Sequence, residues 1–268
     1  MGCLFDESFA HKRVHYPAQR RAFDPELGPA DSVFNRVQLS VRVTPAKRAA
    51  RGGDWCETFA LSKDVIALSI GDVCGHGVEA FPMMLLVRQA VRDAALRGFD
   101  PAQTLAAANR AICMLDPWFY ATAIFALLDT RRRVLTFANA GHPPPLMIGP
   151  GSARFLTYPA ADLPLGIRKV SIRTSRVVNT PASALLVLYT DGVTEYERRP
   201  LLGETQLFDA ARSAYACSAP ATALAIEELM SLPAYNHDDV SILTASLPGV
   251  NLSPHLAWPH RLSHAARS

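Results

Sequence analysis

Short apolar runs dominate the middle of the chain and are separated by glycine, proline, aspartate or charged residues. Such runs are typical of β-strands, which are short and end where turn residues begin. The pattern predicts strands over residues 37–43, 57–61, 65–71, 122–129, 134–140, 185–192 and 240–247.

Two runs, 65–71 and 184–189, are apolar at nearly every position instead of alternating. A strand that faces water on one side alternates apolar and polar residues, so a continuous apolar run indicates cover on both faces. We therefore expect both strands to lie beneath a second sheet or beneath helices.

Helical spacing of apolar residues predicts a helix over 78–97, which Gly98 ends. A second helix is expected over 101–114, with Asp100 as its N-cap and Pro101 at its first position. Two more helices are predicted over 204–216 and 220–232.

The order of elements is strands, two helices, strands, two helices and a final strand. Because strands and helices do not alternate strictly, this order favours a layered α+β fold with mostly antiparallel strands. Residues 1–35 and 248–268 lack apolar periodicity and are expected to be an N-terminal arm and a C-terminal tail. Residues 36–247 are expected to form one domain.

Composition narrows the class of protein. The chain has 268 residues, of which 49% are hydrophobic, and a net charge of +3. A charge this small, without a dense basic block, argues against nucleic-acid binding. No apolar run approaches the roughly 20 residues of a membrane helix, and no signal peptide is seen, so we expect no membrane association and a cytoplasmic location. The five scattered cysteines form no C-x-x-C pair and are expected to be reduced.

The segment GDVCGHG, residues 71–77, joins a buried strand directly to a helix. Its glycines let the backbone turn sharply and approach a bound group closely, and Asp72 stands where the strand ends. A plain turn in which Asp72 caps the helix would also explain the motif. Neither common phosphate-loop spacing is present.

Four more aspartates occupy comparable positions at strand ends: Asp54, Asp191, Asp238 and Asp239. Carboxylates at the ends of different strands can converge on one edge of a layered fold, where oxygen ligands suit Mg²⁺ or Mn²⁺ better than zinc. The alternative is that each aspartate only stabilises its own turn.

Seven segments in order carry a resemblance to a known family: RGGDWCETF, IGDVCGHGVEA, YATAIFALLD, FANAGHPPPLMI, LPLGI, LLVLYTDGVTE and HDDVSILT. Together they resemble the bacterial SpoIIE-type branch of the PPM (type-2C) metal-dependent serine/threonine phosphatases. The resemblance implies a four-layer αββα sandwich, in which two antiparallel sheets are flanked by helix pairs and a two-metal site lies at one edge.

The resemblance also implies roles for individual residues. Asp72 matches the aspartate that bridges both metals, and Val73 matches the residue whose backbone carbonyl is a ligand. Asp54 and Asp191 match further metal ligands. Of the final pair, Asp238 is the preferred ligand and Asp239 the reserve.

His76 is the candidate catalytic histidine beside Asp72. In the eukaryotic branch a general-acid histidine follows the bridging aspartate by two positions, whereas His76 follows it by four. His76 is therefore left as either a proton donor or a turn-stabilising residue. Asn139 and His142 are expected to be structural, and Cys74 is expected to pack rather than to attack.

The implied activity is hydrolysis of phosphoserine or phosphothreonine by a water that two Mn²⁺ or Mg²⁺ ions activate. The implied substrate is a phosphoprotein, such as an anti-sigma-factor antagonist, and a homodimer is an open alternative to a monomer. Two competing hypotheses are a degenerate phosphatase fold that acts as a scaffold and a hydrolase of small phosphoesters.

Overall fold

The protein is described by a computed structural model that covers residues 30–46, 52–75, 80–115, 119–157, 162–195, 199–219, 222–232 and 238–249. Within these residues the chain forms two antiparallel β-sheets and four α-helices. The expected α+β fold class is confirmed.

The two sheets contain every long strand that the sequence predicts. The six-stranded sheet has the order β1 (Ala30–Phe34), β2 (Val37–Thr44), β11 (Val240–Leu247), β10 (Ala184–Tyr189), β7 (Leu146–Gly149) and β8 (Ser152–Phe155). The five-stranded sheet has the order β3 (Trp55–Ala60), β4 (Val65–Val73), β5 (Ala121–Asp129), β6 (Val134–Ala140) and β9 (Arg176–Asn179).

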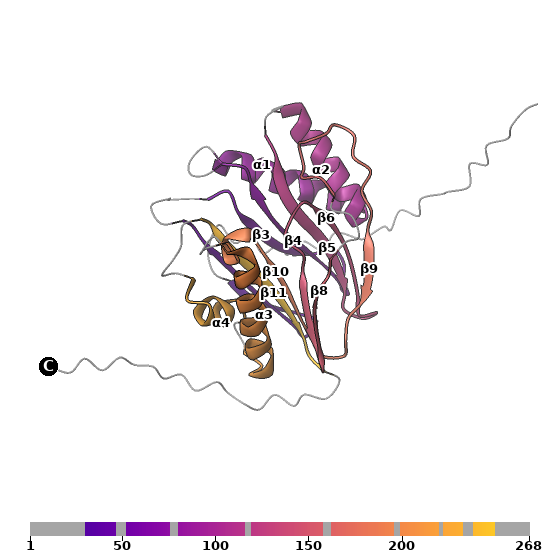
Figure 1. Cartoon of the computed structure of the whole chain (residues 1–268). Coiled ribbons are helices and arrows are strands. Elements are labelled where there is room, and N and C mark those ends of the chain that lie inside the picture. The colour runs from indigo at the N-terminus through magenta and orange to yellow at the C-terminus, as the bar shows by residue number, and fades with distance from the viewer. Residues whose placement is uncertain are drawn as a thin grey trace, which may run out of the picture.

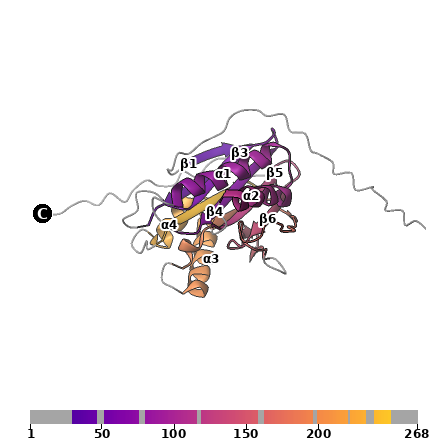
Figure 2. The same cartoon turned by 90° about the horizontal axis from the view of Figure 1, so that it is seen from above.

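The helices cover the outer faces of the sheets in pairs. α1 (Ala80–Leu96) and α2 (Pro101–Leu115) pack on the five-stranded sheet. α3 (Pro200–Ala216) and α4 (Thr222–Leu229) pack on the other sheet. Figure 1 shows the two pairs on opposite sides of the sheets, and Figure 2 shows α1 and α2 lying over β3, β4 and β5. The layers therefore follow the order αββα.

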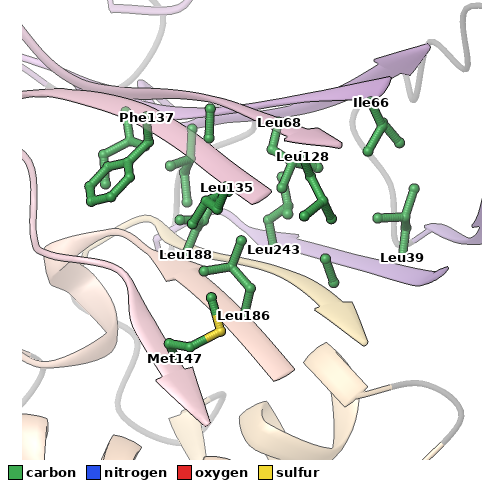
Figure 3. Close-up of a cluster of buried hydrophobic side chains, with 14 of the residues drawn as sticks. Leu39, Ile66, Leu68, Leu128, Leu135, Phe137, Met147, Leu186, Leu188 and Leu243 are labelled. Carbon is green, nitrogen blue, oxygen red and sulfur yellow. The ribbon is translucent and has the colours of Figure 1, made fainter. Parts of the chain in front are cut away.

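The inner faces of the sheets form one apolar layer (Figure 3). Leu68 and Leu135 come from the five-stranded sheet, and Leu186 and Leu243 come from the six-stranded sheet. Along β4, the neighbour Ala67 packs instead in the cluster under α1 and α2. Both faces of β4 are thus covered, as its continuous apolar run predicts.

Local signals located the helix ends well. Gly98 has a positive φ of 81° and donates its backbone N–H to the carbonyl of Ala95 at 3.0 Å, which ends α1. Asp100 accepts the N–H of Gln103 at 2.9 Å, and Gln103 accepts that of Asp100 at 3.2 Å. This reciprocal pair is a capping box, so the predicted N-cap is confirmed.

Four short strands are absent from the sequence-based prediction: β1, β7, β8 and β9. Each has only four or five residues, so a local pattern offers little to recognise. β1 lies in residues 30–34, within the expected N-terminal arm, and pairs with β2 from Ala30↔Val41 to Phe34↔Val37. None of the helices that the structure describes has the length and apolar character needed to span a membrane.

Candidate metal centre

Two strands of the five-stranded sheet bring the first carboxylates together. Asp72 and Val73 are the last residues of β4, and Asp54 directly precedes β3. Because the two strands are antiparallel and Trp55 pairs with Gly71, Asp54 and Asp72 lie at the same end of the sheet. Their close approach follows directly from strand register.

The six-stranded sheet supplies the other carboxylates. Asp191 begins a short 3₁₀ helix just after β10, and Asp238 and Asp239 precede β11. β10 and β11 are antiparallel, with Tyr189 opposite Ile242, so the end of one strand meets the start of the other. A Cβ on Gly192 would lie 2.0 Å from the carbonyl oxygen of Asp239. Only glycine allows the two segments to lie this close.

Hydrogen bonds join these two sheet edges. The hydroxyl of Thr190 donates to Asp54 Oδ2 at 2.7 Å and accepts the backbone N–H of Ser241 at 3.0 Å. The backbone N–H of Gly53 donates to Asp239 Oδ2 at 2.7 Å. The residues at the two strand ends are therefore held in one continuous polar cluster. Sequence reasoning missed Thr190, although a polar residue between an apolar strand and Asp191 was a visible signal.

Burial and the charges of neighbouring carboxylates make Asp54 and Asp72 hard to ionise. Burial, followed by the negative charge of Asp72, raises the pKa of Asp54 well above its usual value, although the Thr190 hydrogen bond opposes this. Burial, and then the charges of Asp191 and Asp238, raise the pKa of Asp72 to about 7. Such an acidic cluster gains from a bound cation, whose positive charge offsets the repulsion.

Asp191 belongs to the same electrostatic group. Burial raises its pKa, followed by the negative charges of Asp238 and Glu195, and its contact with the Gly192 N–H partly offsets this. Asp54, Asp72, Asp191 and Asp238 thus lie near enough for at least one of the others to affect each site electrostatically.

The donor set suits a hard divalent cation. Its candidate side-chain ligands are carboxylates, and a Cβ on Gly53 would lie 3.0 Å from the Val73 carbonyl oxygen and 3.5 Å from Asp72 Oδ1. The glycine thus leaves room beside both candidate ligand atoms. Among the described residues, no three His, Cys, Asp or Glu side chains already lie close enough together to hold an ion.

Two cysteines, Cys56 and Cys74, lie near the aspartates. Cys74 is half-buried, and its sulfur accepts the backbone N–H of Tyr120 at 3.4 Å. Burial raises the pKa of Cys56 well above its usual value, which disfavours the thiolate. These two cysteines, Cys113 and Cys217 are free thiols in the described part of the chain.

The sequence drew attention to two histidines, His76 as a candidate catalytic residue and His142 as a structural one. His76 lies outside the described residues. His142 is buried, its Nδ1 lies 2.8 Å from the Thr122 hydroxyl, and burial lowers its pKa to about 3. Asn139 brackets the His142 backbone with two hydrogen bonds of 2.8 Å. The pair forms a hydrogen-bonded turn in which His142 is the buried member.

Comparison with known proteins gives a consistent set of relatives. A family model described as stage II sporulation protein E (SpoIIE) matches residues 62–248. Phosphoserine phosphatase RsbU of Bacillus subtilis (strain 168) is 28% identical over 168 residues, which cover 62% of this chain and 48% of RsbU. The chain therefore spans about half the length of this relative.

Solved structures share the fold. The RsbU and RsbW domains of Rv1364c from Mycobacterium tuberculosis align with a TM-score of 0.66 and 30% identity, over 79% of this chain and 60% of that one. The catalytic domain of serine threonine protein phosphatase PstP, solved with 2 manganese ions, aligns with a TM-score of 0.60 over 79% of this chain and 98% of that one. PstP is 16% identical and supports the fold alone.

Proposed function

Because the chain belongs to the SpoIIE family, the bacterial branch of the PPM-type metal-dependent phosphatases, we propose that it hydrolyses phosphoserine or phosphothreonine on a bacterial signalling protein. The observation that carries this proposal is the convergence of strand-end aspartates from both sheets, linked by the Thr190–Asp54 and Gly53–Asp239 hydrogen bonds. A fold that kept only the family's shape would not need a group of mutually repelling carboxylates at this edge of the sheets.

In this proposal Asp54, Asp72, Asp191, Asp238 and the Val73 carbonyl hold two Mg²⁺ or Mn²⁺ ions. When bound, such ions lower the pKa of a water molecule and neutralise charge on the phosphoryl oxygens. The carboxylates must lose their protons to bind, so cation affinity should increase with pH through the raised pKa of Asp72. The role of His76 as proton donor stays a prediction.

Thr190 has a testable part in this arrangement. Thr190→Val keeps the size of the side chain but removes the hydroxyl that donates to buried Asp54. We expect about a 10-fold loss of Mn²⁺ affinity, because polar partners of a metal ligand orient it. Isothermal titration calorimetry measures the change. Thr244→Val, at a buried position further along β11, is the matched control and should bind Mn²⁺ like the wild type.

The proposed substrate is a small phosphoprotein of the anti-sigma-factor antagonist type. Support comes from RsbU, which is named a phosphoserine phosphatase, and from Rv1364c, in which RsbU and RsbW domains occur together. A cytoplasmic location and a homodimer belong to the same proposal.

The test is hydrolysis by the purified protein of a phosphoserine protein, p-nitrophenyl phosphate and a nucleoside monophosphate, each with Mn²⁺, Mg²⁺ or EDTA. We expect metal-dependent turnover, fastest on the phosphoprotein. Faster turnover of the nucleotide would indicate a small-molecule phosphoesterase. If no substrate is hydrolysed and calorimetry detects no cation binding, the proposed activity is wrong and the scaffolding hypothesis is favoured.

A further inference from the structure

The Asp239 carboxylate accepts hydrogen bonds from both ends of the connection between β2 and β3. Its side chain is buried, and its Oδ1 accepts the backbone N–H of Ala46 at 2.9 Å. Its Oδ2 accepts the backbone N–H of Gly53 at 2.7 Å. These amides lie at either end of the connection from β2 to β3, directly before Asp54. Both oxygens of Asp239 are therefore used by backbone donors.

Close packing keeps Asp239 in this position. A Cβ on Gly52 would lie 2.1 Å from Asp239 Oδ2, so the loop backbone rests against the carboxylate. On the other side, Gly192 lies against the carbonyl of Asp239. The residue is thus packed between the segment that carries Asp54 and the segment that carries Asp191.

The neighbouring Asp238 has the opposite environment. It is exposed, and its Oδ1 accepts the backbone N–H of Asp239 at 2.8 Å. The two residues just before β11 therefore differ in burial and in their hydrogen-bond partners.

We propose that Asp239 is a positioning residue that clasps Ala46 and Gly53, the two ends of the β2–β3 connection, and so sets the place of Asp54. The catalytic consequence rests on the proposed function, but the clasp itself is a property of the metal-free protein. A carboxylate that accepts two backbone amides forms strong, charge-assisted hydrogen bonds, which suits it to fixing a loop.

Hydrogen exchange tests the clasp without reference to activity. Amide exchange of Ala46 and Gly53 is followed by NMR in the metal-free wild type and after addition of Mg²⁺. We expect both amides to be protected in both states. Loss of this protection when Mg²⁺ binds would show that Asp239 turns from the amides to the cation, and it would overturn the proposal.

Matched variants separate the two aspartates. Asp239→Asn replaces one acceptor oxygen with an NH₂ group that cannot accept an amide proton. We expect at least 10-fold faster exchange at Ala46 or Gly53 while the β4 amides stay protected, and little change at either amide in Asp238→Asn. Unchanged exchange in Asp239→Asn, or the reverse ranking of the two variants, would contradict the clasp.

Cation titration tests the consequence for the site. Asp239→Asn should weaken Mn²⁺ binding about 10-fold, and excess Mn²⁺ should restore most of kcat, because the ligands themselves remain. Asp238→Asn should not be restored. Failure of Mn²⁺ to rescue Asp239→Asn would overturn the positioning role. If the wild type proves inactive, only the proposed function fails, since the exchange experiment still reports on the clasp.

Discussion

Asp72→Asn is expected to make the metal-free protein more stable while it abolishes catalysis. Burial and the charges of Asp191 and Asp238 raise the pKa of Asp72 to about 7, so its ionised form is disfavoured in the fold. Asparagine has nearly the same shape without the charge. At pH 8 in EDTA we expect the free energy of unfolding to rise by roughly 2–4 kcal/mol, since one pKa unit corresponds to about 1.4 kcal/mol.

The sign of the pH dependence follows from the same shift. The folded-state pKa of Asp72, about 7, lies above its ordinary value of 3.8. Between these values the folded protein binds more protons than the unfolded chain, so the stability that Asp72 contributes is lost as pH rises. Urea unfolding at several pH values should show the advantage of Asp72→Asn growing from pH 4 to pH 7 and then levelling off. An advantage that shrinks over this range would contradict the electrostatic explanation.

Divalent cations should reverse the order of stability. Binding to the folded state alone stabilises the wild type by about 4.1 kcal/mol at a cation concentration 1,000 times the Kd, which exceeds the expected advantage of the variant. Asp72→Asn should gain much less, and its Mn²⁺-dependent turnover should fall by about 10³-fold or more, because the bound ions supply several kcal/mol of transition-state stabilisation. Asp93→Asn, at an exposed position of α1, is the control and should match the wild type in both measurements.

Gly71→Ala is the second change with a large expected effect. A Cβ at this position would lie 2.1 Å from the Trp55 ring and 2.4 Å from the carbonyl oxygen of Thr122. Trp55 cannot move aside easily, because it is 1% exposed and its Nε1 donates to the Ser69 hydroxyl at 3.0 Å. We expect a loss of about 3 kcal/mol in the free energy of unfolding, at the upper end for an overpacked core.

The matched control for this change is Gly151→Ala. Gly151 has a positive φ of 68°, but a Cβ added there would meet nothing within 4 Å. Backbone strain alone should cost about 1 kcal/mol at this position. Chemical denaturation of both variants measures the difference, and equal losses would show that the contact with Trp55 is unimportant. Gly71→Ala should also weaken Mn²⁺ binding, because Asp72 is the next residue.

Much of the architecture was predictable because its signals are local. The capping box at Asp100 and the glycine at 98 located the ends of α1 and α2 closely. The continuous apolar runs of β4 and β10 predicted cover on both faces, since desolvation acts on each side chain individually. The short strands β7, β8 and β9 were missed, because four residues carry little pattern and their pairing partners lie elsewhere in the chain.

The sequence by itself determined which carboxylates stand at strand ends, because chain order and turn chemistry place them there. Only the tertiary structure decided which of them meet. Thr190 reaches Asp54 across 136 positions of sequence, and Gly53 reaches Asp239 across 186. The tertiary structure also decided that Asp238 and Asp239, which are adjacent and chemically identical, have different surroundings. The physical reason is that burial is set by how the chain segments pack on one another, which covers Asp239 and leaves Asp238 exposed.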